Sequence, residues 1–397
     1  MMYRHLTARR PVIAQRSVWF LLASSLSTSA MNLRSSIWLK NANVQAERGI
    51  EPTYPALQNT DNVHYDVAVV GGGVVGCTAA YLLKSQGLSV ALLEGRTVGT
   101  GTTGFSTSKV SAQQGLVYNM IASQHDSTAA RAYYDMNLDG IAVMEELVHN
   151  LQLNCEWSRR SHTSFTCESS NEKMVRQEYD LCKSLDIRCS LLNGDQLAEE
   201  LPASINARLA ISFPDQAQFN AYKYCTELAK HIHGQDCSVF ENSRVFHVDQ
   251  GRPHVLHINE NNAKVTANHV ILATHMPIMD RSMHFAMLEP SRSHCVAVKV
   301  NKTSMRNMFI NCEMPMRSLR TTGENDEIVV LAGDGVKQGE GGDTNQLYND
   351  LEAWLRRHYD VREVVAKWSA MDYYSGDHIP FVGRLDRIRL FANFHTV

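Results

Sequence analysis

The chain has 397 residues, of which 44% are hydrophobic and 20% charged, and its formal net charge is −3. These values are ordinary for a globular protein of one large or two smaller domains and argue against extended disorder. The small net charge provides no basic field for a phosphate backbone, and no apolar run is long enough to cross a membrane, so we expect neither a nucleic-acid partner nor a transmembrane segment.

The amino-terminal region is basic and rich in serine. Residues 1–46 contain no aspartate or glutamate, which is typical of a mitochondrial presequence, and we predict one at residues 1–30. Two other interpretations remain open: a secretory signal over residues 16–30, and a start of translation at Met31 that leaves a cytoplasmic protein. The nine cysteines are scattered and form no C-x-x-C pair. They indicate buried thiols in a reducing compartment rather than a disulfide framework.

A strand, a helix and a second strand follow a polar, proline-containing linker that we place at residues 31–62. Residues 64–70 form a short apolar run that ends directly in glycine, which predicts a buried parallel strand. Residues 77–86 carry apolar side chains at helical spacing and stop at Gly87, and residues 88–93 form another apolar run. This order predicts a βαβ unit.

The turn of this unit has the G-x-G-x-x-G pattern of dinucleotide-binding folds. Gly71 permits the tight turn, Gly73 lets a diphosphate approach the backbone, and Gly76 lets the helix pack against the sheet. The diphosphate would meet the free N–H groups and the positive dipole end of the helix that begins beside Gly73.

The acidic residue that completes the pattern is Glu94, at the end of the second strand. A carboxylate there can accept both ribose hydroxyls of an adenosine and repels a 2′-phosphate, which disfavours NADP; a solvated carboxylate at a strand end is the alternative. The cofactor-binding residues predicted in this half of the site are Gly71, Gly73, Val74, Val75, Gly76, Glu94, Gly95 and Arg96.

Residues 95–110 form a stretch of glycine, serine and threonine with few large side chains. The glycine pattern alone serves NAD and FAD equally, so the choice between them rests on this stretch. Its small, donor-rich residues suit close contact with a second phosphate and a flat ring, although a plain flexible loop would have the same composition.

The rest of the chain alternates helices with strands of two kinds. Residues 268–274 form another buried strand, whereas residues 295–300 and 328–331 fit a different, more amphipathic sheet. Helical patterns cover four stretches, residues 127–150, 171–185, 221–233 and 346–359. Core-like strands far from the first βαβ unit predict a nucleotide-binding domain interrupted by substrate-covering segments.

Several segments together resemble the D-amino acid oxidase-like FAD oxidoreductases, and within them the branch whose members often carry a C-terminal Rieske iron–sulfur domain. The matching segments are residues 37–39, 66–76, 101–118, 271–275, 368–372 and 379–383. The resemblance implies FAD as the cofactor. It also implies an α/β fold, with a Rossmann-like FAD-binding domain and a discontinuous substrate domain built on a mostly antiparallel sheet.

The resemblance adds cofactor-binding residues. It implies that the glycine- and hydroxyl-rich stretch lines the pyrophosphate and the isoalloxazine, and that Val245 lays its backbone against the adenine. A plain edge strand at Val245 and a buried strand end at Ala273 are the alternatives. The added residues are Thr102, Thr103, Gly104, Ser106, Thr107, Val245, Ala273, Thr274 and Gly383.

We expect both domains to be assembled from separate pieces of the chain. The FAD-binding domain is predicted at residues 63–150, 214–285 and 367–397. The substrate domain is predicted at residues 151–213 and 286–366.

Several features depart from the family's pattern. The branch has histidine where this sequence has Gln114, and glutamine where it has Met371. Family members continue beyond the position of Val397 with a glycine-containing turn and a helix that cover the flavin, so the last FAD-binding piece is expected to be truncated. Paired Cys-x-His boxes are absent from the sequence, and no iron–sulfur centre is expected.

No motif identifies a catalytic residue. Arg292, Arg317 and Arg320 lie in the expected substrate segments, where an arginine fork would bind a substrate carboxylate, but a solvated surface position is favoured for each.

Four further side chains and one histidine pair were weighed for a role. Trp368, Asp372 and Tyr373 either face the flavin ring or pack in the core, and a structural role is favoured for His275 over contact with the flavin. His231 and His233 have metal-like spacing without an acidic or cysteine partner nearby, so no metal site is predicted.

The predicted function is a FAD-dependent oxidoreductase that oxidises a C–N bond of an amine or amino acid by hydride transfer to flavin N5. The alternatives are a degenerate or truncated flavin-binding protein without turnover and, more weakly, an NAD-dependent dehydrogenase. A small-molecule substrate is expected, but the sequence identifies neither that substrate, the electron acceptor nor the oligomeric state.

Overall fold

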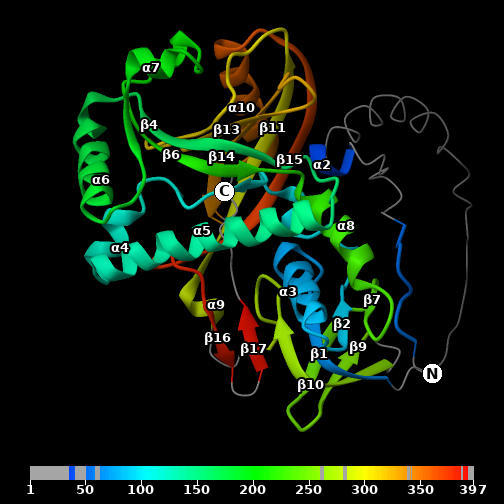
Figure 1. Ribbon diagram of the computed structural model, residues 1–397. Coiled ribbons are helices and arrows are strands. Elements are labelled where there is room, and N and C mark those ends of the chain that lie inside the picture. Colours follow the sequence, from blue (N-terminus) through cyan, green and yellow to red (C-terminus); the bar gives the residue numbers. More distant parts are fainter. Residues whose placement is uncertain are drawn as a thin grey trace, which may run out of the picture.

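The computed structural model describes residues 35–40, 51–58, 63–259, 263–279, 284–337, 340, 342–385 and 388–391. The presequence predicted at residues 1–30 lies outside these ranges. Two sheets organise the described residues, one above the other in Figure 1, and helices pack against them. Within the described ranges, none of the helices combines the length and the apolar character that a bilayer crossing requires.

The first sheet has eight strands, and its central strands run parallel. They are β1 (Val63–Val70), β2 (Val90–Leu93), β7 (Ser238–Phe240), β8 (Val245–Asp249), β9 (His254–Ile258), β10 (Ala263–Leu272), β16 (Val382–Leu385) and β17 (Ile388–Phe391). β1 lies between β2 and β10 and pairs in parallel with both. The buried parallel strand predicted from the apolar run is confirmed.

The side chains of β1 alternate between two cores, as expected of a strand buried on both faces. Val67 and Val69 pack with α3 (Val74–Ser85) and α8 (Ala221–Ile232). Ala68 and Val70 point to the opposite face, where β8 and β9 complete the core. The first strand is therefore held from both sides, which fixes the turn at its end.

The second sheet has nine strands and is mostly antiparallel. They are β3 (Lys109–Val110), β4 (Ser158–Thr166), β5 (Ser190–Asn193), β6 (Leu209–Gln218), β11 (Leu288–Val300), β12 (Met308–Asn311), β13 (Arg317–Thr322), β14 (Ile328–Lys337) and β15 (Val361–Ser375). β11 and β14 contain the runs at residues 295–300 and 328–331, so their assignment to a different sheet is confirmed. The α/β class with a mostly antiparallel second sheet is confirmed as well.

The remaining helices surround the two sheets. They are α4 (Tyr118–Gln124), α5 (Ser127–Asn150), α6 (Glu172–Ser184), α7 (Gly194–Ala198), α9 (His284–Met287), α10 (Thr344–His358) and the 3₁₀ turns η1 (Thr102–Phe105), η2 (Ser169–Asn171) and η3 (Ala203–Ile205). α5 begins where the Asp126 carboxylate accepts a hydrogen bond from the Ala129 N–H at 2.7 Å. The four helical stretches read from the sequence are therefore present.

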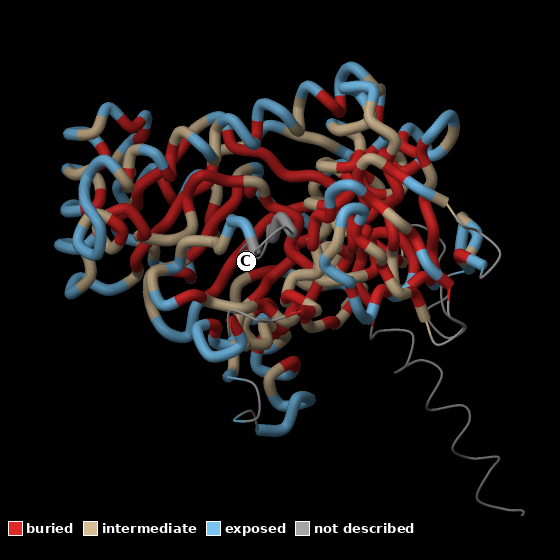
Figure 2. Tube along the Cα trace, turned by 90° about the horizontal axis from the view of Figure 1, so that it is seen from below, coloured by how far each residue is buried: buried red, intermediate tan, exposed pale blue. Residues whose placement is uncertain are grey.

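Part of the expected linker at residues 31–62 belongs to the core. α2 (Ile37–Lys40) buries Ile37 and Trp38 completely, against Trp368 of β15 and Tyr222 of α8. Leu57 is also fully buried, on the β8 and β9 side of the first sheet. In Figure 2 buried segments run through both halves of the molecule. A four-residue helix is too short to show a hydrophobic period, which explains why the sequence did not reveal it.

Candidate functional site

A cavity of about 600 Å³ opens at the carboxyl ends of the parallel strands; we call it the turn cavity. Val70 ends β1, Leu93 ends β2, and Ala273 follows β10, and all three line it. In open parallel sheets ligands bind at this edge, because the loops diverge there. The predicted residues that line the turn cavity are Gly71, Gly73, Val74, Val75, Glu94, Gly95, Arg96, Thr102, Thr103, Val245, Ala273 and Thr274.

The tight turn between β1 and α3 tolerates only glycine at two positions. Gly71 has a φ of +107°, and a Cβ there would lie 2.4 Å from the Ala273 carbonyl oxygen. A Cβ on Gly76 would lie 1.8 Å from the Gly71 carbonyl oxygen. Backbone atoms make both contacts, so neither overlap can be relieved by turning a side chain.

The N-terminus of α3 opens on the turn cavity. Its N-cap, Gly73, supplies no side-chain hydrogen bond, so the helix start depends on other partners. The Val74 N–H donates to Thr103 Oγ1 at 3.1 Å, and the exposed Arg96 adds a positive charge to the rim. The start of a helix, with the positive end of its dipole, and a cation together favour an anion such as a diphosphate.

Glu94 lines the turn cavity and also stabilises the turn. Its Oε2 accepts from the Gly72 N–H at 2.7 Å and its Oε1 from the Arg96 N–H at 2.8 Å. Each carboxylate oxygen has a second lone pair, and the side chain is only partly buried. Glu94 can therefore accept ribose hydroxyls without losing either backbone contact.

The sequence did not point to several other residues that line the turn cavity. Phe246 lies beside Val245 and is 55% exposed, so its ring is available to a flat ligand. The feature of the sequence that could have identified Phe246 is its position directly after Val245, a predicted adenine contact. Gly101, Arg244 and Ile278 line the cavity too.

His275 lines the turn cavity, although the sequence favoured a structural role for it. Its Nδ1 lies 3.2 Å from Thr102 Oγ1, and its ring packs edge-on against Tyr373, with 4.8 Å between centroids. Burial lowers the pKa of His275 to about 4, so the imidazole is neutral at pH 7. It therefore acts there as a hydrogen-bonding group and not as a cation.

A second cavity of about 200 Å³ lies against the antiparallel sheet; we call it the sheet cavity. Its described lining residues are Phe105, Ser106, Thr107, Ser291, Ser293, Cys295, Met314, Pro315, Met316, Ser318, Ala332, Gly333, Gly335, Ala370, Asp372 and Tyr374. Thr102 and Thr103 line the turn cavity, whereas Phe105, Ser106 and Thr107 line the sheet cavity. The two cavities therefore lie at opposite ends of one short segment.

Buried side chains hold this segment rigidly. Each carbonyl of residues 104–108 accepts a hydrogen bond from a side chain. Ser36 Oγ donates to residue 104, Trp368 Nε1 to residue 105 at 2.8 Å and Trp38 Nε1 to residue 106 at 2.7 Å. Arg320 Nη1 donates to residues 107 and 108, at 3.1 and 2.7 Å. Five consecutive carbonyls are thus turned toward the core. The alternative of a plain flexible loop does not describe this segment.

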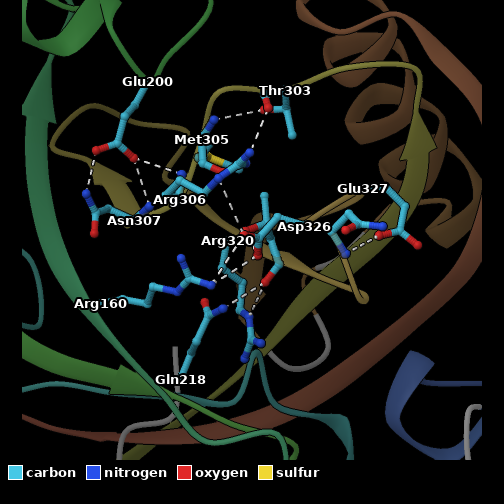
Figure 3. Close-up of polar contacts among 12 residues, drawn as sticks. Arg160, Glu200, Gln218, Thr303, Met305, Arg306, Asn307, Arg320, Asp326 and Glu327 are labelled. Atoms are coloured by element: carbon cyan, nitrogen blue, oxygen red, sulfur yellow. Dashed lines mark hydrogen bonds and ion pairs between the residues drawn. The ribbon is translucent and has the colours of Figure 1, made fainter.

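Two of the three candidate arginines are buried, so the expectation of a solvated position was wrong for them. Arg317 and Arg320 are 8% and 2% exposed, because β13 runs through the middle of the second sheet. Arg320 lies over the Trp38 ring at 4.8 Å, and burial lowers its pKa to about 9. Figure 3 shows Asp326 paired with Arg160. Arg320 Nε donates to the Thr321 carbonyl at 3.2 Å. Arg292 is half-buried and donates to Ser369 Oγ at 3.3 Å.

Three predicted cofactor-binding residues line neither cavity. Gly76 is buried inside α3, and Gly104 is buried where a Cβ would lie 2.4 Å from the Gly99 carbonyl oxygen. Gly383 is exposed on β16. The first two shape the turns, and their contact with a cofactor stays a prediction, as does that of Gly383.

Comparison with protein families gives one match over most of the chain. The family model described as FAD dependent oxidoreductase matches residues 66–396. Among solved structures, glycine oxidase from Geobacillus kaustophilus superposes with a TM-score of 0.67 at 18% identity, covering 84% of this chain and 90% of that one. At this identity the likeness establishes the fold.

Curated relatives were found in bacteria. A putative Rieske 2Fe-2S iron-sulfur protein, YhfW, of Bacillus subtilis is 27% identical over 335 residues, which are 84% of this chain and 64% of the relative. Glycine oxidase of the same organism is 23% identical over 339 residues, covering 81% and 84%. The probable oxidoreductase OrdL of Haemophilus influenzae is 23% identical over 65% of this chain and 60% of its own length. The chain thus spans less than two thirds of YhfW and of OrdL.

Proposed function

The chain belongs to the family of FAD-dependent oxidoreductases, matched over residues 66–396, and on that premise we propose that it oxidises a C–N bond of an amine or an amino acid. The observation that carries this proposal is the segment at residues 102–107, which lines the turn cavity with its first residues and the sheet cavity with its last. A dinucleotide resting its diphosphate on α3 would extend along this segment toward the sheet cavity.

The residues of the turn cavity fit FAD. Gly73 leaves open the space that a Cβ would fill, 2.9 Å from Thr103 Oγ1, and the helix start behind it suits the diphosphate. Glu94 would hold the adenosine ribose, and the exposed ring of Phe246 would lie against the adenine. The described wall has two arginines, Arg96 and Arg244, and no acid other than Glu94.

The sheet cavity would hold the substrate. When bound, FAD supplies a hydride acceptor at N5 of a flat ring. Ser106 and Thr107 would lie against that ring, and the hydrogen bonds that their carbonyls accept from Trp38 and Arg320 would hold them in place. A cavity of about 200 Å³ is large enough to admit a small amine.

The visible spectrum of the purified chain tests the proposal. We expect absorption bands of bound flavin that bleach when an amine or amino acid is added without oxygen, and mass spectrometry of the heat-released cofactor should give FAD. A colourless protein, or one that releases NAD, would contradict it. Flavin that no amine or amino acid in a broad panel bleaches would instead indicate a flavin-binding protein without turnover.

A mitochondrial location is a separate proposal, which depends on the acid-free composition of residues 1–46. The relatives named above are bacterial and give it no support. Fluorescence microscopy of the full chain with a carboxyl-terminal fluorescent tag decides it, with a chain starting at Met31 as the matched control. Mitochondrial signal only for the longer chain is expected, and equal cytoplasmic signal for both would refute it.

A further inference from the structure

The sheet cavity contains one acidic side chain among its described lining residues, Asp372. Asp372 lies on β15, where alternate residues face the same side of the strand, so that Ala370 and Tyr374 line the cavity with it. Its side chain is 2% exposed, and across the pair with β11 it faces Ser291. An aspartate this deeply buried needs a partner for its charge.

The protein supplies only some of the hydrogen bonds that the Asp372 carboxylate can accept. The Ser293 hydroxyl is hydrogen-bonded to Asp372, and the same hydroxyl contacts Tyr374. Asp372 Oδ1 has no hydrogen-bond partner. Burial raises the pKa of Asp372 to about 7, and the Ser293 hydroxyl opposes that shift only in part. Since a buried acceptor without a donor is unfavourable, Oδ1 is an open place for a donor on a ligand.

Among its described lining residues the sheet cavity has no lysine, arginine or histidine. Lys109 is buried nearby but donates to Ser318 Oγ at 2.6 Å and to the Phe309 carbonyl at 2.9 Å. The Arg317 guanidinium lies next to Gly333, with Nη1 2.8 Å from the place of a Cβ there, and donates to the Met316 carbonyl, but Arg317 is not among the described lining residues. A carboxylate in the cavity would therefore meet no cation on the described lining.

The remaining walls suit an alkyl group. Phe105, Met314, Met316 and Ala332 contribute apolar surface, and Met side chains adapt to different shapes. The hydroxyls of Ser291 and Ser293 lie on the β11 wall, on the side of Asp372. Ser106, Thr107 and Ser318 line other parts of the cavity. Among its described lining residues the cavity is thus acidic at one wall, where Asp372 lies, and uncharged elsewhere, with apolar and hydroxyl side chains.

We propose that the sheet cavity binds the ammonium group of an alkylamine on Asp372 and selects amines without an α-carboxylate over amino acids. This inference rests on the proposed function and names the substrate class of its site. An ammonium brings three donors, so it supplies the hydrogen bond that Oδ1 lacks and the charge that the carboxylate needs. A neutral alcohol of the same shape supplies one donor without charge, and an amino acid adds a carboxylate that has no partner.

Three small probes of nearly equal shape test this without turnover. tert-Butylamine and 2-aminoisobutyrate have no hydrogen on the carbon beside nitrogen, so hydride removal cannot consume them, and tert-butanol is the uncharged analogue. Their dissociation constants are measured by isothermal titration calorimetry on the full chain with its flavin bound. We expect tert-butylamine to bind at least tenfold more tightly than either of the other two.

Two variants locate the effect. Asp372→Asn keeps the shape but removes the charge, so the affinity for tert-butylamine should fall at least tenfold while that for tert-butanol changes less than about threefold. Asp180→Asn is the matched control, because it removes the same charge from an exposed residue of α6 that lines neither cavity, and it should change the affinity for tert-butylamine less than about threefold. If Asp372→Asn does not fold, the three probes on the unaltered chain still decide.

The outcomes separate this inference from the proposed function. Absence of FAD from the purified chain overturns the proposed function and this inference with it. A chain that carries FAD but binds 2-aminoisobutyrate or tert-butanol as tightly as tert-butylamine overturns the inference alone. Tight binding of 2-aminoisobutyrate would indicate that Arg317 reaches the cavity and pairs with the carboxylate. Equal binding of tert-butylamine by the Asp372→Asn variant overturns it too.

Discussion

The turn cavity and the sheet cavity are built from different parts of the polypeptide. Backbone shape makes the turn cavity: glycines at three fixed positions, a helix start and one carboxylate at a strand end. Side chains make the sheet cavity, and they come from strands as far apart in the chain as β11 and β15. Backbone requirements leave a local pattern in the sequence, whereas a set of side chains gathered by strand pairing leaves none. Substitutions should therefore act differently in the two cavities.

The largest effect is expected at Gly76. A Cβ there would lie 1.8 Å from the Gly71 carbonyl oxygen, and only a shift of the whole turn could relieve this overlap. We expect Gly76→Ala to cost more than about 4 kcal/mol of unfolding free energy and to abolish FAD binding, as large clashes in packed cores do. Urea unfolding and the flavin content of the purified variant measure both.

Gly140→Ala is the control for this substitution. Gly140 is exposed on α5, and nothing lies within 4 Å of the place of its Cβ. Alanine should stabilise the helix there by about 0.5–1 kcal/mol. If Gly76→Ala were as stable as the unaltered chain, the packing of α3 against the turn would differ from that described above.

The second effect concerns the sheet cavity and depends on pH. Burial raises the pKa of Asp372 to about 7 from 3.8. Because the folded pKa lies above the unfolded one, the contribution of this group to stability is complete below about pH 4 and is lost as the pH rises through 7. Without an amine, the chain should lose about 3 kcal/mol of unfolding free energy between pH 5 and pH 8 through this group.

Asp372→Asn shows whether the loss belongs to this residue. Asparagine does not titrate, so the variant should lack this component of the pH dependence in urea unfolding. Cys295 and Tyr374 line the same cavity, but burial raises the pKa of each, so both stay protonated over the range. An identical pH dependence in the variant would show that Asp372 does not titrate near pH 7.

The sequence revealed the turn cavity well because its elements are short and local. The apolar run before Gly71, the helical spacing after Gly76 and the acid at Glu94 all follow from positions within one βαβ unit. Most residues predicted from this unit line the cavity. Phe246 was missed because an aromatic residue on a strand carries no sign of exposure.

The sheet cavity and its supports were mostly invisible in the sequence. β13 reads RSLRTT, a polar run that suggests a surface strand, yet all six residues are buried. Neighbouring strands pair with it at both edges, and other elements cover its side chains, since Leu319 packs with side chains of α10 and Arg320 lies over Trp38. Arg320 is tolerated there because backbone carbonyls of residues 107 and 108 accept its hydrogen bonds. Those partners lie more than 200 positions away in the chain, and no local pattern could indicate them.

Replacement of Arg320 tests how much its hydrogen bonds stabilise the segment that joins the two cavities. Methionine keeps the aliphatic part but leaves the carbonyls of Thr107, Ser108 and Phe219 without this donor. We expect Arg320→Met to cost about 2 kcal/mol in urea unfolding, because buried carbonyls lose their partner. Exposed Arg188, paired with Asp215 at the surface, is the control, and Arg188→Met should leave stability unchanged. Equal stability of both variants would show that the segment does not need Arg320.

The smallest effect is expected at Glu94. Glutamine keeps the size, but its amide is a weaker acceptor toward ribose hydroxyls and toward the N–H groups of Gly72 and Arg96. Glu94→Gln should raise the dissociation constant of FAD about tenfold, or about 1.4 kcal/mol, measured by fluorescence titration of the flavin-free chain. Glu146→Gln on the exposed face of α5 should not change it. Unaltered FAD affinity in Glu94→Gln would place the ribose elsewhere.

A crystal structure of the purified chain with its own cofactor tests most directly whether one dinucleotide joins the two cavities. Density should place the adenosine ribose within hydrogen-bonding distance of Glu94, the diphosphate at the start of α3, and the flavin ring against Phe105, Ser106 and Thr107 at the mouth of the sheet cavity. A ring that leaves the segment at residues 102–107 uncovered, or a diphosphate bound away from Gly73, would contradict the account.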